Sequence, residues 1–271
     1  MSSLAPFSLA TWNINSVRLR LPLVLDFLAR HPVDVLCLQE IKCQNEQFPA
    51  AALAAAGYPH QAVHGQKGYH GVAIVSKLPL AEIMTRSFCN IAESRHVSAR
   101  LDFGRGPLTV HNFYIPAGGD EPDPAINPKF RHKLDFLAEL QSWFAEPAFA
   151  AGQLICGDFN IAPHEDDVWS HKQLLDVVSH TPLETGLLDA LRDGNHGWTD
   201  LVRAHIPYGT KLYSWWSYRA QDWQASDRGR RLDHVWATAD IAARSSAAEI
   251  IRPARGWSEK PSDHVPVIVH F

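Results

Sequence analysis

Short apolar runs that each end in a polar cluster recur along the chain, with helical segments between them. Residues 7–12 read as a strand that runs into 13–15 (NIN), and residues 33–38 (VDVLCL) read as a buried strand that runs into 39–40 (QE). Leucines at near-helical spacing over 17–30 predict a helix between them, ending before a proline. This alternation predicts an α/β protein whose functional site lies at one edge of a sheet.

The same pattern continues to the C-terminus. Helices are expected over 48–56 and 130–144, and strands over 71–76, 108–114, 153–156, 233–238 and 265–271. The Gly-, Pro- and Asp-rich stretch 117–128 and the segment 219–231 are expected to be functional loops rather than linkers. One domain covering residues 1–271 is therefore predicted.

Composition narrows the function classes. The net charge is -4 and the pI about 6.4, which excludes the broad basic surface of a protein that coats nucleic acid. An acidic balance suits a site that holds a divalent cation among carboxylates. The four cysteines show no CxxC pairing and are expected to be free and reduced. With neither a secretory signal nor a membrane span evident, a cytoplasmic protein is expected.

Five polar clusters stand beside the apolar runs. They are Asn13-Ile14-Asn15, Gln39-Glu40, Gly157-Asp158-Phe159-Asn160, Leu232-Asp233-His234 and Ser262-Asp263-His264. Oxygen-bearing side chains with few thiolates form a hard ligand set, which favours Mg²⁺ or Mn²⁺ over Zn²⁺. Asp158 and Asn160 are two positions apart, so on a strand they would project from the same face.

Taken singly, each cluster also has an ordinary structural explanation. An Asp-His pair near a C-terminus is commonly a surface turn, and Gly-Asp-x-Asn is rich in turn formers. Glu40 is a stronger signal, because a carboxylate at the end of an apolar strand needs a partner. The aromatic cluster of residues 213–218 is typical of core packing, and residues 228–231 are typical of a solvated turn. The occurrence of all five polar clusters in one chain favours a catalytic site.

Eight segments show a resemblance to a known family. They are TWNINSVR (11–18), VDVLCLQEIK (33–42), GQKGYHGVAIVSK (65–77), NFYIPAGG (112–119), GDFNIAP (157–163), YSWWSYR (213–219), DRGRRLDHVWAT (227–238) and EKPSDHVPV (259–267). In this order they resemble the exonuclease III family of DNA-repair nucleases, within the endonuclease/exonuclease/phosphatase superfamily. The resemblance implies a deoxyribonuclease I-like four-layer α/β sandwich, in which helices flank two packed mixed β-sheets.

The resemblance implies a metal site and a set of catalytic residues. Glu40 would bind Mg²⁺, for which Mn²⁺ would substitute, and Asn13 and Asn15 would lie near the same ion. The full set of implied metal ligands is Asn13, Glu40, Asp158, Asn160, Asp263 and His264. The implied catalytic residues are Tyr114, Asp158, Asn160, Asp233 and His264.

Each implied catalytic residue has an expected role. Asp158 would orient or deprotonate the attacking water, and Asn160 would hold that water or the phosphate. His264 would contact the scissile phosphate, with Asp233 accepting its other ring proton. Tyr114 would contact the phosphate or assist the leaving group. The cation would neutralise charge that develops on the phosphoryl and leaving oxygens.

The expected partner is double-stranded DNA with abasic sites, nicks or 3′ ends, bound by a monomer without a membrane. The expected DNA contacts are Asn15, Arg18, Lys42, Lys67, Trp215, Trp216, Arg219, Arg228, Arg230 and Arg231. One departure from the family concerns the pocket for a base-free sugar, which Trp215, Trp216 and Leu232 would line. Arg230 aligns where the family has a large apolar residue, and it would either narrow and charge that pocket or swing out to a phosphate.

The implied activities are 3′-to-5′ exonuclease, abasic-site endonuclease and 3′-phosphodiesterase. A superfamily phosphatase or phospholipase is an alternative, but segments 213–219 and 227–238 match the nuclease branch. A DNA-binding protein without catalysis is the other alternative, although every implied catalytic position holds a competent residue.

Overall fold

Two mixed sheets pack face to face in the computed structural model, which describes residues 6–104, 106–194, 196–220, 222–257 and 260–271. The first sheet has the order β13-β14-β1-β2-β4-β3. Its strands are β1 (Ser8–Asn13), β2 (Val35–Gln39), β3 (His60–His64), β4 (Val72–Ser76), β13 (Ala247–Ile250) and β14 (Val267–His270). The pairs β1–β2 and β7–β8 are parallel, and the other pairs within the two sheets are antiparallel.

The second sheet has the order β5-β6-β7-β8-β12-β9. Its strands are β5 (Ala81–Thr85), β6 (His96–Asp102), β7 (Pro107–Tyr114), β8 (Gln153–Asp158), β9 (Thr199–Asp200) and β12 (Asp233–Ala237). A short separate ribbon pairs β10 (Trp215–Trp216) with β11 (Gly229–Arg230). This ribbon lies in the segments that were expected to surround the site.

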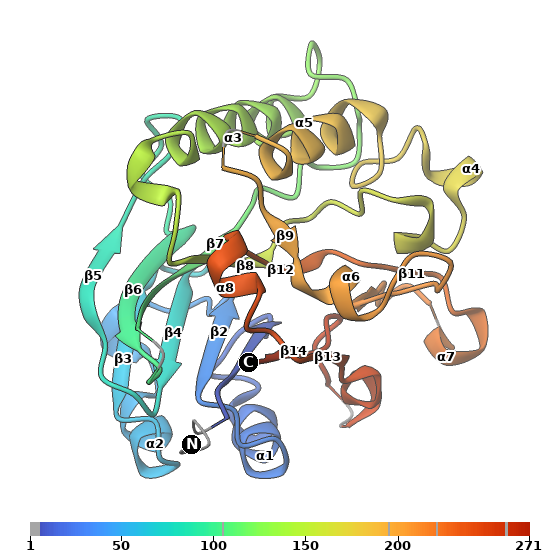
Figure 1. Cartoon of the computed structure of the whole chain (residues 1–271). Coiled ribbons are helices and arrows are strands. Elements are labelled where there is room, and N and C mark those ends of the chain that lie inside the picture. The colour runs from blue at the N-terminus through green and yellow to red at the C-terminus, as the bar shows by residue number, and fades with distance from the viewer. Residues whose placement is uncertain (1–5, 105, 195, 221, 258–259) are drawn as a thin grey trace.

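Helices cover the outer faces of both sheets. In Figure 1, α1 (Leu21–Arg30) and α2 (Ala50–Ala55) lie outside the first sheet, and α3 (Pro128–Phe144) and α5 (Pro182–Arg192) lie outside the second. The predicted four-layer α/β sandwich is therefore confirmed. The shorter helices are α4 (His171–Leu174), α6 (Leu201–His205), α7 (Trp223–Ser226), α8 (Ala239–Ala242), and the 3₁₀ turns η1 (Asn45–Gln47), η2 (Pro147–Phe149), η3 (Glu165–Asp167) and η4 (Arg252–Gly256).

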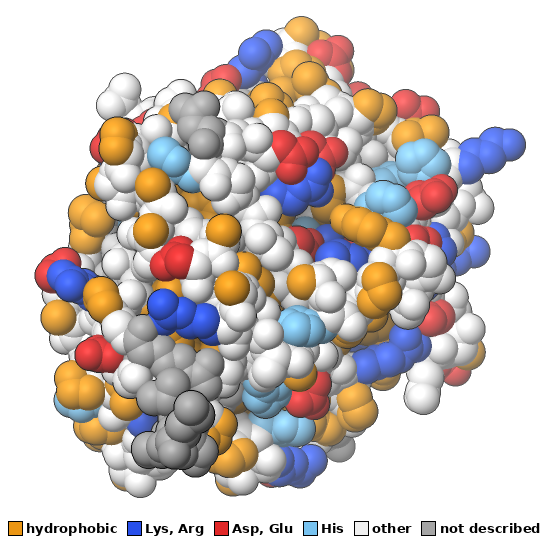
Figure 2. Space-filling view, viewed as in Figure 1, with side chains coloured by type: hydrophobic (Ala, Val, Ile, Leu, Met, Phe, Trp, Pro, Cys, Tyr) orange, Lys and Arg blue, Asp and Glu red, His pale blue; other side chains and the backbone are white. Residues whose placement is uncertain are grey.

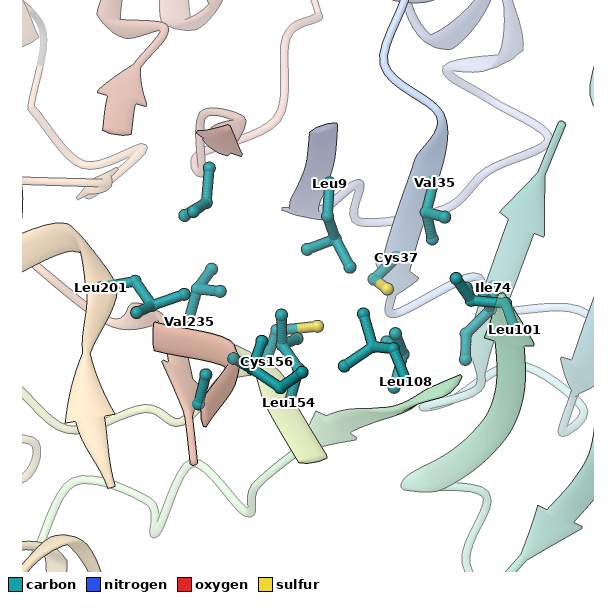
Figure 3. Packing of buried hydrophobic residues seen from close by; sticks show 14 of the residues in the cluster. Leu9, Val35, Cys37, Ile74, Leu101, Leu108, Leu154, Cys156, Leu201 and Val235 are labelled. Carbon is teal, nitrogen blue, oxygen red and sulfur yellow. The ribbon is translucent and has the colours of Figure 1, made fainter. Parts of the chain in front are cut away.

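Alternate residues of the central strands fill the space between the sheets. Leu9, Val35 and Cys37 from the first sheet face Leu154, Cys156 and Val235 from the second (Figure 3). The intervening residues of the same strands point outward, where Ala10, Leu36 and Leu38 pack with α1, and Ile155 and Trp236 pack with α3 and α5. Both faces of these strands are therefore apolar, which is why they read as continuous apolar runs. The four cysteines are free, as expected, and Cys37, Cys43 and Cys156 are buried.

The helix predicted over residues 17–30 begins later than expected, at Leu21. The backbone N–H groups of Ser16 and Val17 donate to the carbonyls of Glu40 (2.7 Å) and Ile41 (3.2 Å), so they are committed to the loop after β2. Pro22 lies in the first turn of α1, where its missing N–H costs nothing. The loop after β1 is thus tied to the loop after β2.

Several elements were not predicted. Strand β5 is exposed along its whole length and β3 is half-buried, so neither has an apolar run. Helix α5 begins at a capping box formed by Thr181 and Glu184. Among the described residues, no helix combines the length and apolar composition that crossing a membrane requires.

Candidate active site

The predicted polar clusters meet at one edge of the sandwich. Asn13 ends β1, Glu40 follows β2, Tyr114 ends β7 and Asp158 ends β8. Asn13 is in register with Gln39, and Tyr114 with Asp158, because each pair lies on neighbouring parallel strands. The carboxyl ends of parallel strands share one edge of a sheet, so each sheet brings its own polar residues together there.

One side chain joins the two sheets at this edge. The Asn13 amide nitrogen donates to Glu40 Oε1 and to Asp158 Oδ2, each at 2.9 Å, and Asn13 Oδ1 accepts from the Asn15 backbone N–H at 3.0 Å. Asn13 is completely buried. It therefore holds carboxylates from different sheets at a set separation and presents a donor to both.

Asp158, Asp233 and His264 form a buried acid–base cluster. His264 Nδ1 lies 2.8 Å from Asp233 Oδ2, and His264 Nε2 lies 3.6 Å from Asp158 Oδ2. Asp233 pairs with Asp158 in the register of β12 and β8. The predicted contact between Asp233 and His264 is present, and it fixes the imidazole with Nε2 directed toward Asp158.

Burial and charge set the protonation of this cluster. Burial raises the pKa of Asp158 to about 7, although the nearby His264 cation lowers it. Burial lowers the pKa of His264, but the Asp233 and Asp158 carboxylates more than offset this effect and raise it to about 10. Asp158 is thus poised near neutrality to accept a proton, and His264 favours the imidazolium form.

Asn160 lies next to the cluster because of a turn after β8, and not because it lies on the strand as predicted. It lies beyond β8 in the left-handed region, with a φ of 56°. Its backbone N–H donates to Asp158 Oδ1 at 2.9 Å, and its Nδ2 donates to Ile115 O at 2.9 Å and Asp158 Oδ2 at 3.2 Å. The expectation that both side chains project from one strand face is wrong, because a tight turn brings them together. The preceding Gly157 has a φ of 135°, and a Cβ there would lie 1.9 Å from Phe113 O.

A buried ion pair supports this turn from behind. Lys133 Nζ donates to Asn160 O at 2.8 Å and to the Glu184 carboxylate, and both side chains are completely buried. Glu184 Oε1 accepts from the backbone N–H groups of Ser179 (2.7 Å) and Thr181 (3.1 Å). The pair thereby connects the Asn160 turn to the loop at residues 178–181.

Lys42 lies within the oxygen cluster rather than apart from it. Its Nζ is 2.7 Å from Glu40 Oε2 and 2.6 Å from Asn15 Oδ1. Burial raises the pKa of Glu40, but Lys42 and the Asn13 amide reverse the effect, so the net shift is downward. Glu40 is therefore a carboxylate that is well suited to a cation.

Tyr114 is buried beside Glu40 and is held by a residue that the sequence did not reveal. The Arg95 guanidinium lies 5.0 Å from the Tyr114 ring centroid, and its Nη1 donates to Tyr114 O at 3.2 Å. Burial, together with the Glu40 and Asp158 charges, raises the pKa of Tyr114 well above its ordinary value. The phenol therefore stays protonated and able to donate.

Serine hydroxyls also organise the site. Ser262 Oγ donates to Asn13 O at 2.6 Å and accepts from the His264 N–H at 3.2 Å. Ser214 Oγ accepts from the backbone N–H groups of Leu232 (3.0 Å) and Asp233 (3.1 Å). Ser262 lies in a predicted cluster, Ser214 lies in the segment 213–219 without having been singled out, and Arg95 lies outside all the segments that carry the resemblance.

Asp263 lies beside this centre. Its Oδ2 accepts from Trp215 Nε1 at 3.0 Å and its Oδ1 accepts from Asn15 Nδ2 at 3.2 Å. Both carboxylate oxygens thus have protein donors. Asp263, which is predicted as a metal ligand, positions Trp215 and Asn15 next to the cluster in this arrangement.

A cavity of about 570 Å³ opens from the cluster. Its lining includes Glu40, Tyr114, Asp158, Asn160, Asp263 and His264, together with Trp169, Val178, Trp215, Arg219, Arg228, Arg230 and Leu232. The predicted DNA contacts Trp215, Arg219, Arg228 and Arg230 thus share a cavity with the catalytic candidates. Trp169 had no signal in the sequence. The Arg228 guanidinium lies 4.6 Å from its ring centroid.

Two predicted DNA contacts are wrong. Trp216 is 1% exposed and packs in the core beneath the first sheet, so it can neither stack on DNA nor line the cavity. Arg231 is fully buried, and its guanidinium is bound to Asp167 (2.7 Å) and Asp200 (2.7 Å). Alternation along the strand explains both cases, because Trp215 and Arg230 face the cavity and their neighbours face inward.

The remaining predicted contacts, Arg18 and Lys67, are exposed on loops. On the face in Figure 2, basic side chains are scattered among acidic ones. This distribution agrees with the net charge of -4. On this face the basic groups are local and are not gathered into one broad patch (Figure 2).

The fold and site define the class of protein. The chain matches the Endonuclease/Exonuclease/phosphatase family over residues 10–264, and it belongs to this family. It is 33% identical to exodeoxyribonuclease III of Haemophilus influenzae, over 96% of this chain and 98% of that protein. The predicted kinship with exonuclease III nucleases is thereby confirmed, and so is the prediction of a hydrolytic enzyme.

Solved structures of related nucleases have the same architecture as this chain. A 3′–5′ exonuclease from Neisseria meningitidis has a TM-score of 0.87 and 31% identity, covering 97% of this chain and 98% of that chain. An AP endonuclease from Archaeoglobus fulgidus has a TM-score of 0.88 and 29% identity with the same coverage. Relatives with exonuclease and with AP endonuclease names therefore share this architecture along nearly the whole chain.

Proposed function

We propose that this protein is a Mg²⁺-dependent DNA-repair phosphodiesterase with 3′-to-5′ exonuclease, abasic-site endonuclease and 3′-phosphodiesterase activities. One observation carries the proposal. A buried Asp158–His264–Asp233 cluster and the Asn13–Glu40 pair lie at the same sheet edge, and they open into a cavity lined by arginines and tryptophans. The substrate is double-stranded DNA with an abasic site, a nick or a 3′ end.

The protein's own groups divide the reaction between them. Asp158, with its pKa near neutrality, accepts a proton from the attacking water, and the Asn160 amide orients that water or the phosphate. The His264 imidazolium, held by Asp233, donates a hydrogen bond to a phosphoryl oxygen that gains charge. Tyr114, kept protonated by its surroundings, donates to the phosphate or to the leaving oxygen.

The donor set fits a hard divalent cation. Asp158 is a buried carboxylate, Glu40 is a half-buried one, and Asp233 Oδ1 is a buried oxygen without a hydrogen-bond partner among the described residues. Oxygen donors of this kind suit Mg²⁺ and Mn²⁺. Glu40 and Asp158 would hold the ion, with Asn13, Asn160, Asp263 and His264 as the remaining candidates. When bound, the cation neutralises charge on the phosphoryl and leaving oxygens.

The test uses two duplexes, one with an internal tetrahydrofuran abasic analogue and one with a recessed 3′ end. The wild type should cleave both with Mg²⁺, and neither with a chelator. Glu40→Gln should weaken Mn²⁺ binding in calorimetry, a measurement independent of turnover. Asp240→Asn changes a carboxylate at the start of α8 that does not line the cavity, and it serves as the control. Failure of the Mg²⁺-loaded wild type to cut either duplex would overturn the proposal.

We also propose that residues 1–271 form one catalytic domain that acts as a monomer. The polar clusters of the site come from both ends of the chain, Asn13 near its start and His264 near its end. Light scattering of the purified protein, with and without duplex, should give the mass of one chain. A dimer mass for the free protein would contradict this part of the proposal.

A further inference from the structure

Arg230 lies in a row of residues that leads away from the catalytic cluster. In the short ribbon Arg230 is in register with Trp215, and Trp215 forms a bridge with His264. Neighbouring strands lie about 4.8 Å apart, so the Arg230 backbone is roughly 10 Å from that of His264. Arg230 and His264 line the same cavity from this separation.

The Arg230 guanidinium is fixed against the wall of the cavity. Its Nη1 donates to Val178 O at 3.0 Å and to Ser179 Oγ at 2.6 Å, and its Cζ lies 5.4 Å from the Trp215 ring centroid. Ser179 is itself held by Glu184, the partner of Lys133. Arg230 is thus anchored to the scaffold that supports the Asn160 turn, and it does not swing out to a distant phosphate.

Most donors of this guanidinium have no protein acceptor. Within the described part of the chain, only Nη1 makes hydrogen bonds, and Nε is buried without a partner. A buried unsatisfied donor is unfavourable and therefore calls for an explanation. Arg230 lines the cavity that also contains His264, so its Nη2 donors, which make no hydrogen bond within the described residues, are available to a substrate group with acceptors.

The side chains of Arg230 and Trp215 favour the binding of a base over that of a base-free sugar. A base offers ring and carbonyl acceptors that arginine recognises, and a flat face that stacks on an indole. A base-free sugar supplies neither at this distance, and it would leave the guanidinium desolvated and unpaired. An apolar residue at position 230 would have the opposite preference.

We propose that Arg230, held on Trp215, is a specificity-determining residue that makes the pocket beside His264 accept the base of a 3′-terminal nucleotide in preference to a base-free sugar. The inference rests on the proposed function, because it concerns which substrate the same site accepts. It assigns the 3′-terminal nucleotide of a duplex as the preferred substrate, ahead of the abasic site.

The test compares matched duplexes that differ only at the recessed 3′ terminus, which carries either a normal nucleotide or a tetrahydrofuran nucleotide. The readout is the ratio of their kcat/KM values with Mg²⁺. The wild type should favour the normal terminus, and Arg230→Leu should lower the ratio by roughly 10-fold or more. Arg230→Gln, which keeps a donor for Ser179, should also lower the ratio. It keeps the inference testable if the leucine variant does not fold.

Arg252→Leu is the matched control. Arg252 also lies over a tryptophan, 5.0 Å from the Trp216 ring centroid, and pairs with Asp227, but it is not part of the cavity lining. The ratio of the two kcat/KM values for Arg252→Leu should equal that of the wild type. An unchanged or increased ratio in both Arg230 variants, with an active wild type, overturns the inference. An inactive wild type on both duplexes instead overturns the proposed function.

Discussion

Replacement of Lys133 by methionine would remove the cation of a completely buried ion pair and leave Glu184 charged. Lys133 Nζ donates to Asn160 O, to Ala117 O at 3.3 Å and to Glu184. Breaking a buried pair from one side typically destabilises a protein by about 3–5 kcal/mol. Glu184 keeps its bonds from Ser179 and Thr181, so we expect a loss near the lower limit, about 3 kcal/mol.

The assay is urea unfolding followed by tryptophan fluorescence and circular dichroism. Lys133→Met should lower the free energy of unfolding, with the dependence on urea concentration unchanged. Adding Glu184→Gln to this variant should recover about 1–2 kcal/mol, because it removes the unpaired charge. Lys129→Met changes an exposed lysine of the same helix and should cost less than about 0.5 kcal/mol. A loss below about 1 kcal/mol for Lys133→Met, or no recovery in the double variant, would refute this reasoning.

Three further predictions concern the site and the core. Asp158→Asn should lower turnover by roughly 100-fold or more while leaving DNA affinity in a filter-binding assay largely intact, because it removes a proton acceptor; near-normal turnover would exclude Asp158 as the base. Burial lowers the pKa values of His111 and His234 to about 4, so the native state binds fewer protons than the unfolded state, whose histidines titrate near about 6.5. Their contribution, up to about 3 kcal/mol each, is complete above that pH and is lost as the pH falls toward 4; a melting temperature that stays constant over this range would contradict the assignment. Arg231→Met should destabilise the protein by about 3–5 kcal/mol through the uncompensated Asp167 charge, measured by urea unfolding; a change typical of a surface site would instead support the original prediction of a phosphate contact.

Local sequence patterns predicted several of the central strands and the polar clusters at their ends, but not the central strand β6. A strand that is buried on both faces must be apolar throughout, so β1, β2, β4 and β8 were visible as runs. Edge strands β3 and β5 lack this requirement, because solvent reaches them. The polar residues at the strand ends were conspicuous because a carboxylate beside an apolar run needs a partner.

Only the tertiary structure decided which residues face the cavity and how they are held. The sequence did not distinguish Trp215 from Trp216, or Arg230 from Arg231, as DNA contacts. In the structure Trp215 and Arg230 face the cavity, whereas Trp216 and Arg231 face the interior. A shift of one position along a strand reverses the face, and composition does not specify that phase.

The contacts that join distant segments at the site were equally absent from local sequence patterns. Asn13 contacts Glu40 and Asp158, and Lys133 contacts Asn160 and Glu184, across separations of 27, 145, 27 and 51 residues. Such contacts depend on the packing of layers rather than on any local pattern. By itself, the sequence determined the kind of chemistry, because residue types at strand ends set the available donors and acceptors. The fold decided their distances, their protonation and the position of Arg230 in the pocket wall, because burial and separation exist only once the sheets have packed.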